Sequence, residues 1–128
     1  MKKKYLIVIA DYYKDISRGL LNSAKNVLPK SSLIKIINVP GVFEIPVTIS
    51  KNIKKYDAFL ALGCVIKGQT PHFDFISHSS TDAIMKLSVD NKKPIGNGII
   101  TCLNMRQAIA REKKGGEAAQ AVISVLSQ

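Results

Sequence analysis

The sequence alternates between short apolar runs and longer segments in which apolar residues recur with helical spacing. The apolar runs are rich in β-branched residues, which is typical of strands buried on both faces of a sheet. They occupy residues 5–10, 33–39, 58–66 and 95–102. The segments with helical spacing occupy residues 15–28, 44–53, 71–90, 104–113 and 117–126. This order predicts parallel strands joined by crossover helices.

A four-stranded parallel sheet with helices on both faces fits a chain of 128 residues, and we expect one domain over residues 1–128. The predicted fold class is therefore α/β, a three-layer α/β/α sandwich of the flavodoxin-like kind. Such folds bind ligands beyond the carboxyl ends of the strands. The loops at those ends are residues 11–14, 40–43, 67–70 and 102–104. They locate a candidate site without naming a reaction.

The third apolar run leads into a short polar loop and then a helix start. Residues 62–74 read LGCVIKGQTPHFD. Thr70 and Pro71 are a favourable pair for the cap and the first position of a helix, so His72 is expected in the first helical turn. Free N–H groups at a helix N-terminus attract anions, and a histidine titrates near neutral pH. An ordinary turn with a surface histidine fits the same residues, so both interpretations stay open.

Other side chains at predicted strand and helix ends also have a structural and a functional interpretation. Glu44 either binds ligand hydroxyls or complements a helix dipole. Tyr12 and Tyr13 either stack on a flat ligand or pack locally. Arg111 and the lysines at 113–114 either hold a phosphate or compensate the helix ends.

The amino-acid composition limits the kinds of binding partner that the protein can have and the cellular compartment in which it can work. The chain has 19 basic and 9 acidic residues and a net charge of +10, which favours anionic partners without choosing among them. Cys64 and Cys102 lack metal-ligand spacing, so we expect buried, reduced thiols and no metal.

The basic N-terminus imitates a signal peptide, but its apolar run is short and a polar segment follows at once. No apolar stretch reaches the roughly 20 residues that span a bilayer, and we expect a cytoplasmic protein without a membrane partner.

Several longer motifs follow one another along nearly the whole chain. They are VPGVFEIP at 39–46, YDA at 56–58, LGCVIKGQTPHFD at 62–74, PIGNGIIT at 94–101, QAIAR at 107–111 and KGGEAA at 114–119. Together they resemble the 6,7-dimethyl-8-ribityllumazine synthase family of riboflavin biosynthesis. The PGxFEIP and LGxVI(K/R)GxTxHxD patterns are long and specific.

The resemblance implies a transferase that works without a cofactor on two small-molecule substrates. The expected reaction condenses 5-amino-6-(D-ribitylamino)uracil with 3,4-dihydroxy-2-butanone 4-phosphate. The pyrimidine amine attacks the ketone to give an imine, phosphate leaves, and the second nitrogen closes the ring of the lumazine. Much of the catalysis is then orientation of two substrates, which suits a site without a nucleophile.

The resemblance also implies roles for individual residues. His72 is the expected proton-transfer residue. The residues expected to bind the phosphate are Gln69, Thr70, Lys114 and, from a neighbouring subunit, Arg111. Those expected to contact the pyrimidine or the ribityl chain are Tyr12, Val42, Phe43, Glu44, Cys64, Val65, Ile66 and, from the adjacent subunit, Asn97, at a position that is often aromatic.

Three departures from the family pattern bear on the assembly and the ring pocket. The N-terminal arm that lies on a neighbour's sheet in the family is missing, since the first strand starts near residue 5. Tyr13 stands where an asparagine often sits. The segment between Arg111 and Lys114 is shorter than usual, whereas icosahedral members carry a longer kink there. We therefore predict a homopentamer with sites at subunit interfaces, rather than a sixty-subunit shell.

Two alternatives to a working enzyme remain. The first is a non-catalytic basic binding module for RNA or flavin-like ligands. Its support is the charge alone, because aromatic residues interleaved with basic ones and nucleic-acid motifs are absent from the sequence, so no nucleic-acid partner is expected. The second is a family member that keeps the assembly but has lost turnover, and the presence of Thr70, His72 and Arg111 argues against it.

Overall fold

The structure, a computed structural model, describes residues 2–69 and 71–128. Its sheet is parallel throughout and has the strand order β2-β1-β3-β4. The strands are β1 (Lys4–Ala10), β2 (Leu33–Val39), β3 (Ala58–Ile66) and β4 (Ile95–Cys102). Each predicted strand is confirmed, and only β1 differs, by one residue at its start. The order 2-1-3-4 is that of the first four strands of a flavodoxin-like sheet.

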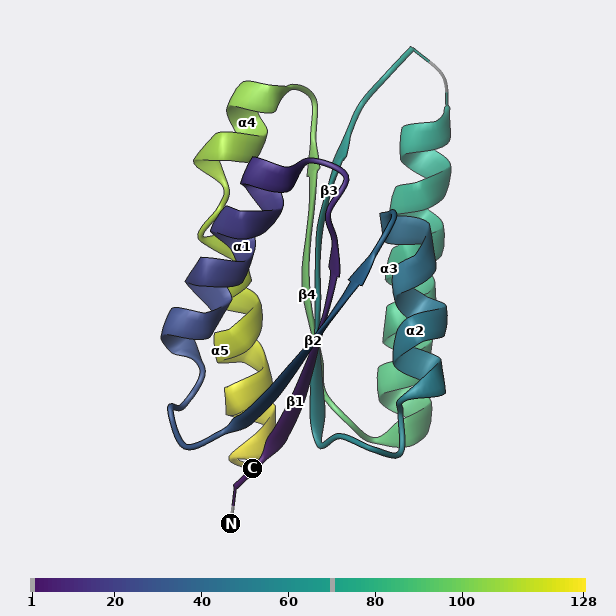
Figure 1. The fold of residues 1–128 in the computed structure, drawn as a ribbon. Coiled ribbons are helices and arrows are strands. Elements are labelled where there is room, and N and C mark those ends of the chain that lie inside the picture. The colour runs from purple at the N-terminus through teal and green to yellow at the C-terminus, as the bar shows by residue number, and fades with distance from the viewer. Residues whose placement is uncertain (1, 70) are drawn as a thin grey trace.

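Helices cover both faces of the sheet, which confirms the three-layer α/β/α sandwich. Figure 1 shows α1, α4 and α5 on one face and α2 and α3 on the other. The helices are α1 (Lys14–Val27), α2 (Ile45–Lys51), α3 (His72–Asn91), α4 (Met105–Ala110) and α5 (Lys114–Leu126), and a 3₁₀ turn, η1 (Val42–Glu44), precedes α2.

The central strand β1 explains why its sequence is apolar without alternation. Leu6, Ile7 and Val8 are all fully buried. Successive side chains of a strand point to opposite faces, so Leu6 and Val8 join the core under α2 and α3 while Ile7 joins the core under α1 and α5. Both layers of helices thus pack on the same strand.

The α4–α5 junction differs from the sequence-based prediction. Helix α5 was expected to begin at residue 117 after a glycine break, but it begins at Lys114 and includes Gly115 and Gly116. A Cβ on Gly115 would overlap the backbone carbonyl of Leu20 in α1. The Gly116 N–H donates to the Ser23 hydroxyl at 2.8 Å. The two glycines therefore allow α5 to pack closely against α1, and they do not end a helix.

Candidate active site

A cavity of about 710 Å³ lies at the carboxyl edge of the sheet. Its walls come from the loop after β1, the segment after β2, the end of β3 and the first turn of α3. Strands β1 and β3 are neighbours although they are not consecutive in the chain, and such a switch point is where open α/β sheets bind ligands. The predicted site residues that line the cavity are Tyr12, Val42, Phe43, Glu44, Cys64, Val65, Ile66 and His72.

The cavity also contains residues that were not predicted as site residues, namely Tyr13, Gly41 and Ile76. Ile76 lies four positions after His72, and residues at that spacing share one face of a helix. The spacing could therefore have indicated Ile76. Tyr13 was raised as part of a stacking platform with Tyr12 but was not assigned to the site.

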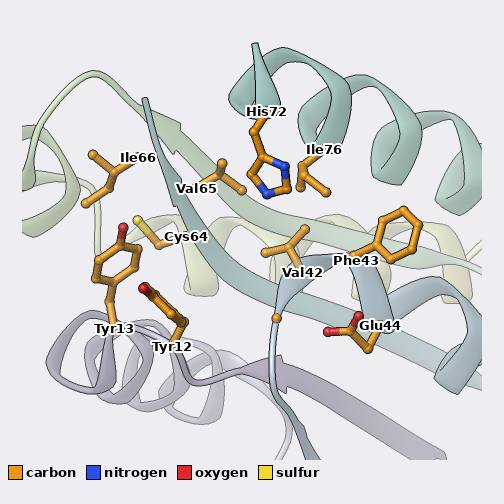
Figure 2. Close-up of a pocket in the computed structure, with 11 residues that line it drawn as sticks. Tyr12, Tyr13, Val42, Phe43, Glu44, Cys64, Val65, Ile66, His72 and Ile76 are labelled. Carbon is orange, nitrogen blue, oxygen red and sulfur yellow. The ribbon is translucent and has the colours of Figure 1, made fainter. Parts of the chain in front are cut away.

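Two tyrosines form the wall on the α1 side of the cavity. The ring centroids of Tyr12 and Tyr13 lie 4.9 Å apart, with the ring planes at 84°. This edge-to-face arrangement is a favourable one for aromatic rings. Figure 2 shows both rings on the opposite side of the cavity from His72 and Ile76. Tyr12 is 74% exposed, so a flat ligand can reach its ring.

Glu44 ends η1 and occupies the cap position of α2. Its N–H donates to the Gly41 carbonyl at 3.1 Å, and its own carbonyl accepts from the Thr48 hydroxyl at 2.8 Å. These bonds fix the backbone at the cavity wall. Pro46 lies in the first turn of α2, as predicted. A carboxylate here complements the helix dipole and also faces any ligand in the cavity.

His72 is the first residue of α3. Figure 2 shows its imidazole pointing into the cavity, near Val42 and Ile76. The preceding Pro71 occupies the cap position, so the helix begins one residue later than predicted, and the Pro71 carbonyl accepts from the N–H groups of Asp74 and Phe75 at 3.0 and 3.2 Å. The predicted cap and phosphate ligand, Thr70, lies outside the described residues.

The end of β3 supplies the apolar wall between these two sides. Burial raises the pKa of the Cys64 thiol to about 12, and the nearby Cys102, through its charge and a hydrogen bond, adds to the rise. Because a thiol with so high a pKa stays protonated at neutral pH, Cys64 is a poor nucleophile. Cys64, Val65 and Ile66 therefore shape the cavity and do not supply its reactive groups. The prediction that both cysteines are buried and unpaired is confirmed.

The remaining predicted site residues do not line this cavity. Gln69 is exposed in the loop between β3 and α3. Asn97 is exposed on the edge strand β4, where its side chain accepts from the Ile99 N–H at 3.1 Å. Arg111 caps the end of α4 and donates to the Thr101 carbonyl at 3.1 Å. Lys114 begins α5, with its ammonium 3.9 Å from Glu117. Asn97 and Arg111 thus lie on or beside the free edge of the sheet, where a second chain could reach them.

Within 2–69 and 71–128, no group of three or more His, Cys, Asp or Glu side chains could hold a metal ion. Across the same part of the chain, no helix has the length and apolar character needed to cross a membrane.

The chain is similar to proteins of one family along its whole length. The model of the family described as 6,7-dimethyl-8-ribityllumazine synthase matches residues 2–128. A protein of that name from Rhodopseudomonas palustris (strain BisA53) is 43% identical over 94% of this chain and 82% of its own length. Proteins of the same name from Agrobacterium fabrum and Bartonella henselae are 40% and 43% identical over 98% of this chain, and the matches cover 95% and 88% of their lengths.

Proposed function

Because this chain belongs to the 6,7-dimethyl-8-ribityllumazine synthase family, we propose that it catalyses the synthesis of 6,7-dimethyl-8-ribityllumazine in riboflavin biosynthesis. The substrates are 5-amino-6-(D-ribitylamino)uracil and 3,4-dihydroxy-2-butanone 4-phosphate, and phosphate and water are released. The observation that supports the proposal most strongly is that Tyr12, Glu44 and His72, which lie on three separate segments of the chain, line one cavity.

The proposed roles follow from where the side chains lie around the cavity. The exposed ring of Tyr12 stacks on the pyrimidine, because its face is open to a flat ligand. The segment from Val42 to Glu44 holds the ribityl chain, with the Glu44 carboxylate accepting from ribityl hydroxyls. The end of β3, Cys64 to Ile66, packs against the edge of the ring.

His72 transfers protons between the two substrates as they condense. Imine formation removes protons from the attacking amine, and departure of the phosphate is helped by a proton donor. One imidazole can serve both steps, because its two ring nitrogens can accept and donate a proton. The larger part of the rate enhancement comes from holding the amine beside the ketone. This mechanism uses side chains alone.

The phosphate side of the site is completed by a neighbouring subunit in a homopentamer. We assign phosphate binding to Gln69, Thr70, Lys114 and Arg111. The neighbouring subunit supplies Arg111, and it also supplies Asn97 to the pyrimidine side of the site. Two observations support a shared site. Asn97 is exposed on the edge strand β4 and Arg111 is exposed beside that strand, and neither lines the cavity of its own chain.

The expectations of one domain over residues 1–128 and of a cytoplasmic location remain predictions. The alternative, a non-catalytic basic module, rests on the net charge of +10. A charge of this kind is a property of the surface and does not by itself indicate a nucleic-acid site.

The experiment mixes the purified protein with both substrates and follows the absorbance and fluorescence of the lumazine product. The proposal predicts product formation well above the spontaneous rate. A rate equal to the spontaneous one would remove the enzyme assignment. Salt-sensitive binding of an RNA oligonucleotide, with no acceleration of the reaction, would favour the basic binding module instead.

A further inference from the structure

Tyr13 lines the cavity but has no role in the proposed function. We propose that Tyr13 is a positioning residue for the pyrimidine substrate, which sets the tilt of the Tyr12 ring and offers its own hydroxyl to the polar edge of the bound pyrimidine. This inference rests on the proposed function, because it takes the pyrimidine as the ligand.

The backbone of Tyr13 is fixed to the sheet. Tyr13 occupies the cap position of α1, and its carbonyl accepts from the Ser17 N–H at 2.9 Å. Ser17 is 3% exposed, and its hydroxyl donates to the Ala10 carbonyl at the end of β1 at 2.7 Å. The first turn of α1 is thereby tied to β1, and Tyr13 is held at a constant place beside the cavity.

The ring of Tyr13 supports the more exposed ring of Tyr12. Tyr13 is half-buried and packs against the core under α1 and α5, whereas Tyr12 is 74% exposed. Among the described residues, the ring contact of Tyr12 is its edge-to-face contact with Tyr13, at 4.9 Å and 84°. An exposed side chain held by one half-buried aromatic neighbour loses less freedom when a ligand stacks on it, and such preorganisation favours binding.

The hydroxyl of Tyr13 adds a polar group to an apolar part of the wall. Figure 2 shows it on the side of the cavity where Cys64 and Ile66 lie. Burial raises the pKa of this hydroxyl, and the nearby Tyr12 and Cys64 raise it further. The group therefore stays protonated at neutral pH and can both donate and accept a hydrogen bond. A pyrimidinedione presents carbonyl and N–H groups along its edge, and a hydroxyl can bond to either.

Three variants separate the two parts of the proposal. Tyr13→Phe keeps the ring pair and removes the hydroxyl, Tyr13→Leu removes both, and Tyr12→Leu removes the stacking ring. The measurements are the calorimetric Kd of 5-amino-6-(D-ribitylamino)uracil and the KM of each substrate. Thermal unfolding of each variant shows whether it is folded.

The expected result is a selective loss of pyrimidine binding. Tyr13→Phe should raise the Kd and KM of the pyrimidine about fivefold, the effect of one lost neutral hydrogen bond. The KM of the phosphate substrate should not change. Tyr13→Leu should raise the pyrimidine Kd further. The double variant Tyr12→Leu/Tyr13→Leu should lose less binding free energy for the pyrimidine than the two single variants lose together. The reason is that the two rings act as a pair.

An unchanged pyrimidine Kd in Tyr13→Phe would overturn the role of the hydroxyl. Additive losses in the double variant would overturn the support of Tyr12. An equal rise in KM for both substrates would show a general structural effect and would also overturn the proposal. If the wild-type protein binds the pyrimidine without making product, the proposed function fails while the Kd comparison still decides the role of Tyr13. A wild-type protein that does not bind the pyrimidine contradicts both.

Discussion

At the scale of single residues, helix α3 carries two histidines that differ in their position. One of them points into the cavity, and the other lies outside the cavity. His72 begins α3 and lines the cavity, while His78 is exposed about 1.7 turns further along the helix and does not line it. Proximity to bound substrate, and not residue type, should therefore decide which histidine affects turnover.

Replacing His72 by Ala should reduce kcat by about 10²–10⁴-fold, the usual contribution of one acid-base group. The uncatalysed condensation sets a floor below which the measured rate cannot fall. His78→Ala is the matched control and should leave kcat unchanged. Steady-state kinetics with both substrates measures the effect. Similar rates for wild type and His72→Ala would contradict the assignment of His72.

The buried thiol of Cys64 should make the protein less stable at high pH. Its folded-state pKa is raised from the ordinary value of 9.0 to about 12, so the folded protein holds this proton more tightly than the unfolded chain. The stabilisation is complete below about pH 9 and is lost as the pH rises toward 12. Cys64→Ala should therefore show a shallower fall of Tm with pH over that range.

The slope of Tm against pH is the quantity to compare, because the smaller side chain lowers Tm at every pH. The pKa values of Tyr5 and Tyr13 are also raised, mainly by burial, and both tyrosines are present in wild type and variant alike. The contribution of Tyr5 cancels in the difference, and that of Tyr13 cancels except for the part of its raised pKa that Cys64 itself causes. Parallel curves for the two proteins would contradict the account of Cys64.

At the scale of elements, the close contact between α1 and α5 depends on glycine. A Cβ on Gly115 would overlap the Leu20 carbonyl, which is backbone and cannot rotate away. Gly115→Ala should lower the free energy of unfolding by about 1–3 kcal/mol through overpacking, although Ala is the better helix former by about 1 kcal/mol.

Gly68→Ala is the matched control for this prediction, because a Cβ at Gly68 meets no atom of the described residues within 4 Å, apart from its two chain neighbours. It should change the free energy of unfolding little. Denaturant unfolding of the three proteins provides the measurement. A Gly115→Ala variant as stable as wild type would show that the two helices can separate without cost.

The same junction shows where prediction from sequence stops. The strands were predicted to within one residue, because a buried parallel strand leaves a continuous apolar run in its own sequence. The glycines at 115–116 were interpreted as a helix break, which is their usual meaning. Their packing role depends on Leu20 and Ser23, which lie far away in the sequence and carry no local signal.

The site divides in a similar way. The positions of Tyr12, Glu44 and His72 followed from their places at the carboxyl ends of the strands, because topology brings those ends together. The ring angle between Tyr12 and Tyr13 depends on three-dimensional packing and could not be predicted. Arg111 does not line the cavity of its own chain, and only the family resemblance assigned it to a neighbour's site.

At the scale of the whole molecule, the pentamer is a prediction, and the surface of α2 and α3 is a candidate for its interfaces. Large apolar side chains are exposed there, among them Val47 on α2 and Phe75, Met85 and Val89 on α3, which are 58%, 66%, 62% and 65% exposed. In the predicted pentamer, a neighbouring subunit would cover exposed apolar side chains such as these. Native mass spectrometry should give the mass of five chains. A monomer, or a shell of sixty chains, would contradict the pentamer.

The central claim is that one active site is built from two chains, with His72 from one and Arg111 from the next. Alone, Arg111→Ala should raise the KM of the phosphate substrate more than that of the pyrimidine, because it removes a phosphate ligand. Alone, His72→Ala should lower kcat. In a mixed oligomer, some interfaces join a chain with intact His72 to a neighbour with intact Arg111.

Mixed oligomers of His72→Ala and Arg111→Ala chains, made by co-expression with two different tags and purified on both, test this claim most directly. The measurement is lumazine formation per chain, compared with each single-variant oligomer at the same protein concentration and at a phosphate-substrate concentration well below the KM of the Arg111→Ala oligomer. A shared site predicts that the mixed oligomers are clearly more active than either parent. A rate no higher than the average of the two parents would contradict it, because His72 and Arg111 would then have to act within the same chain.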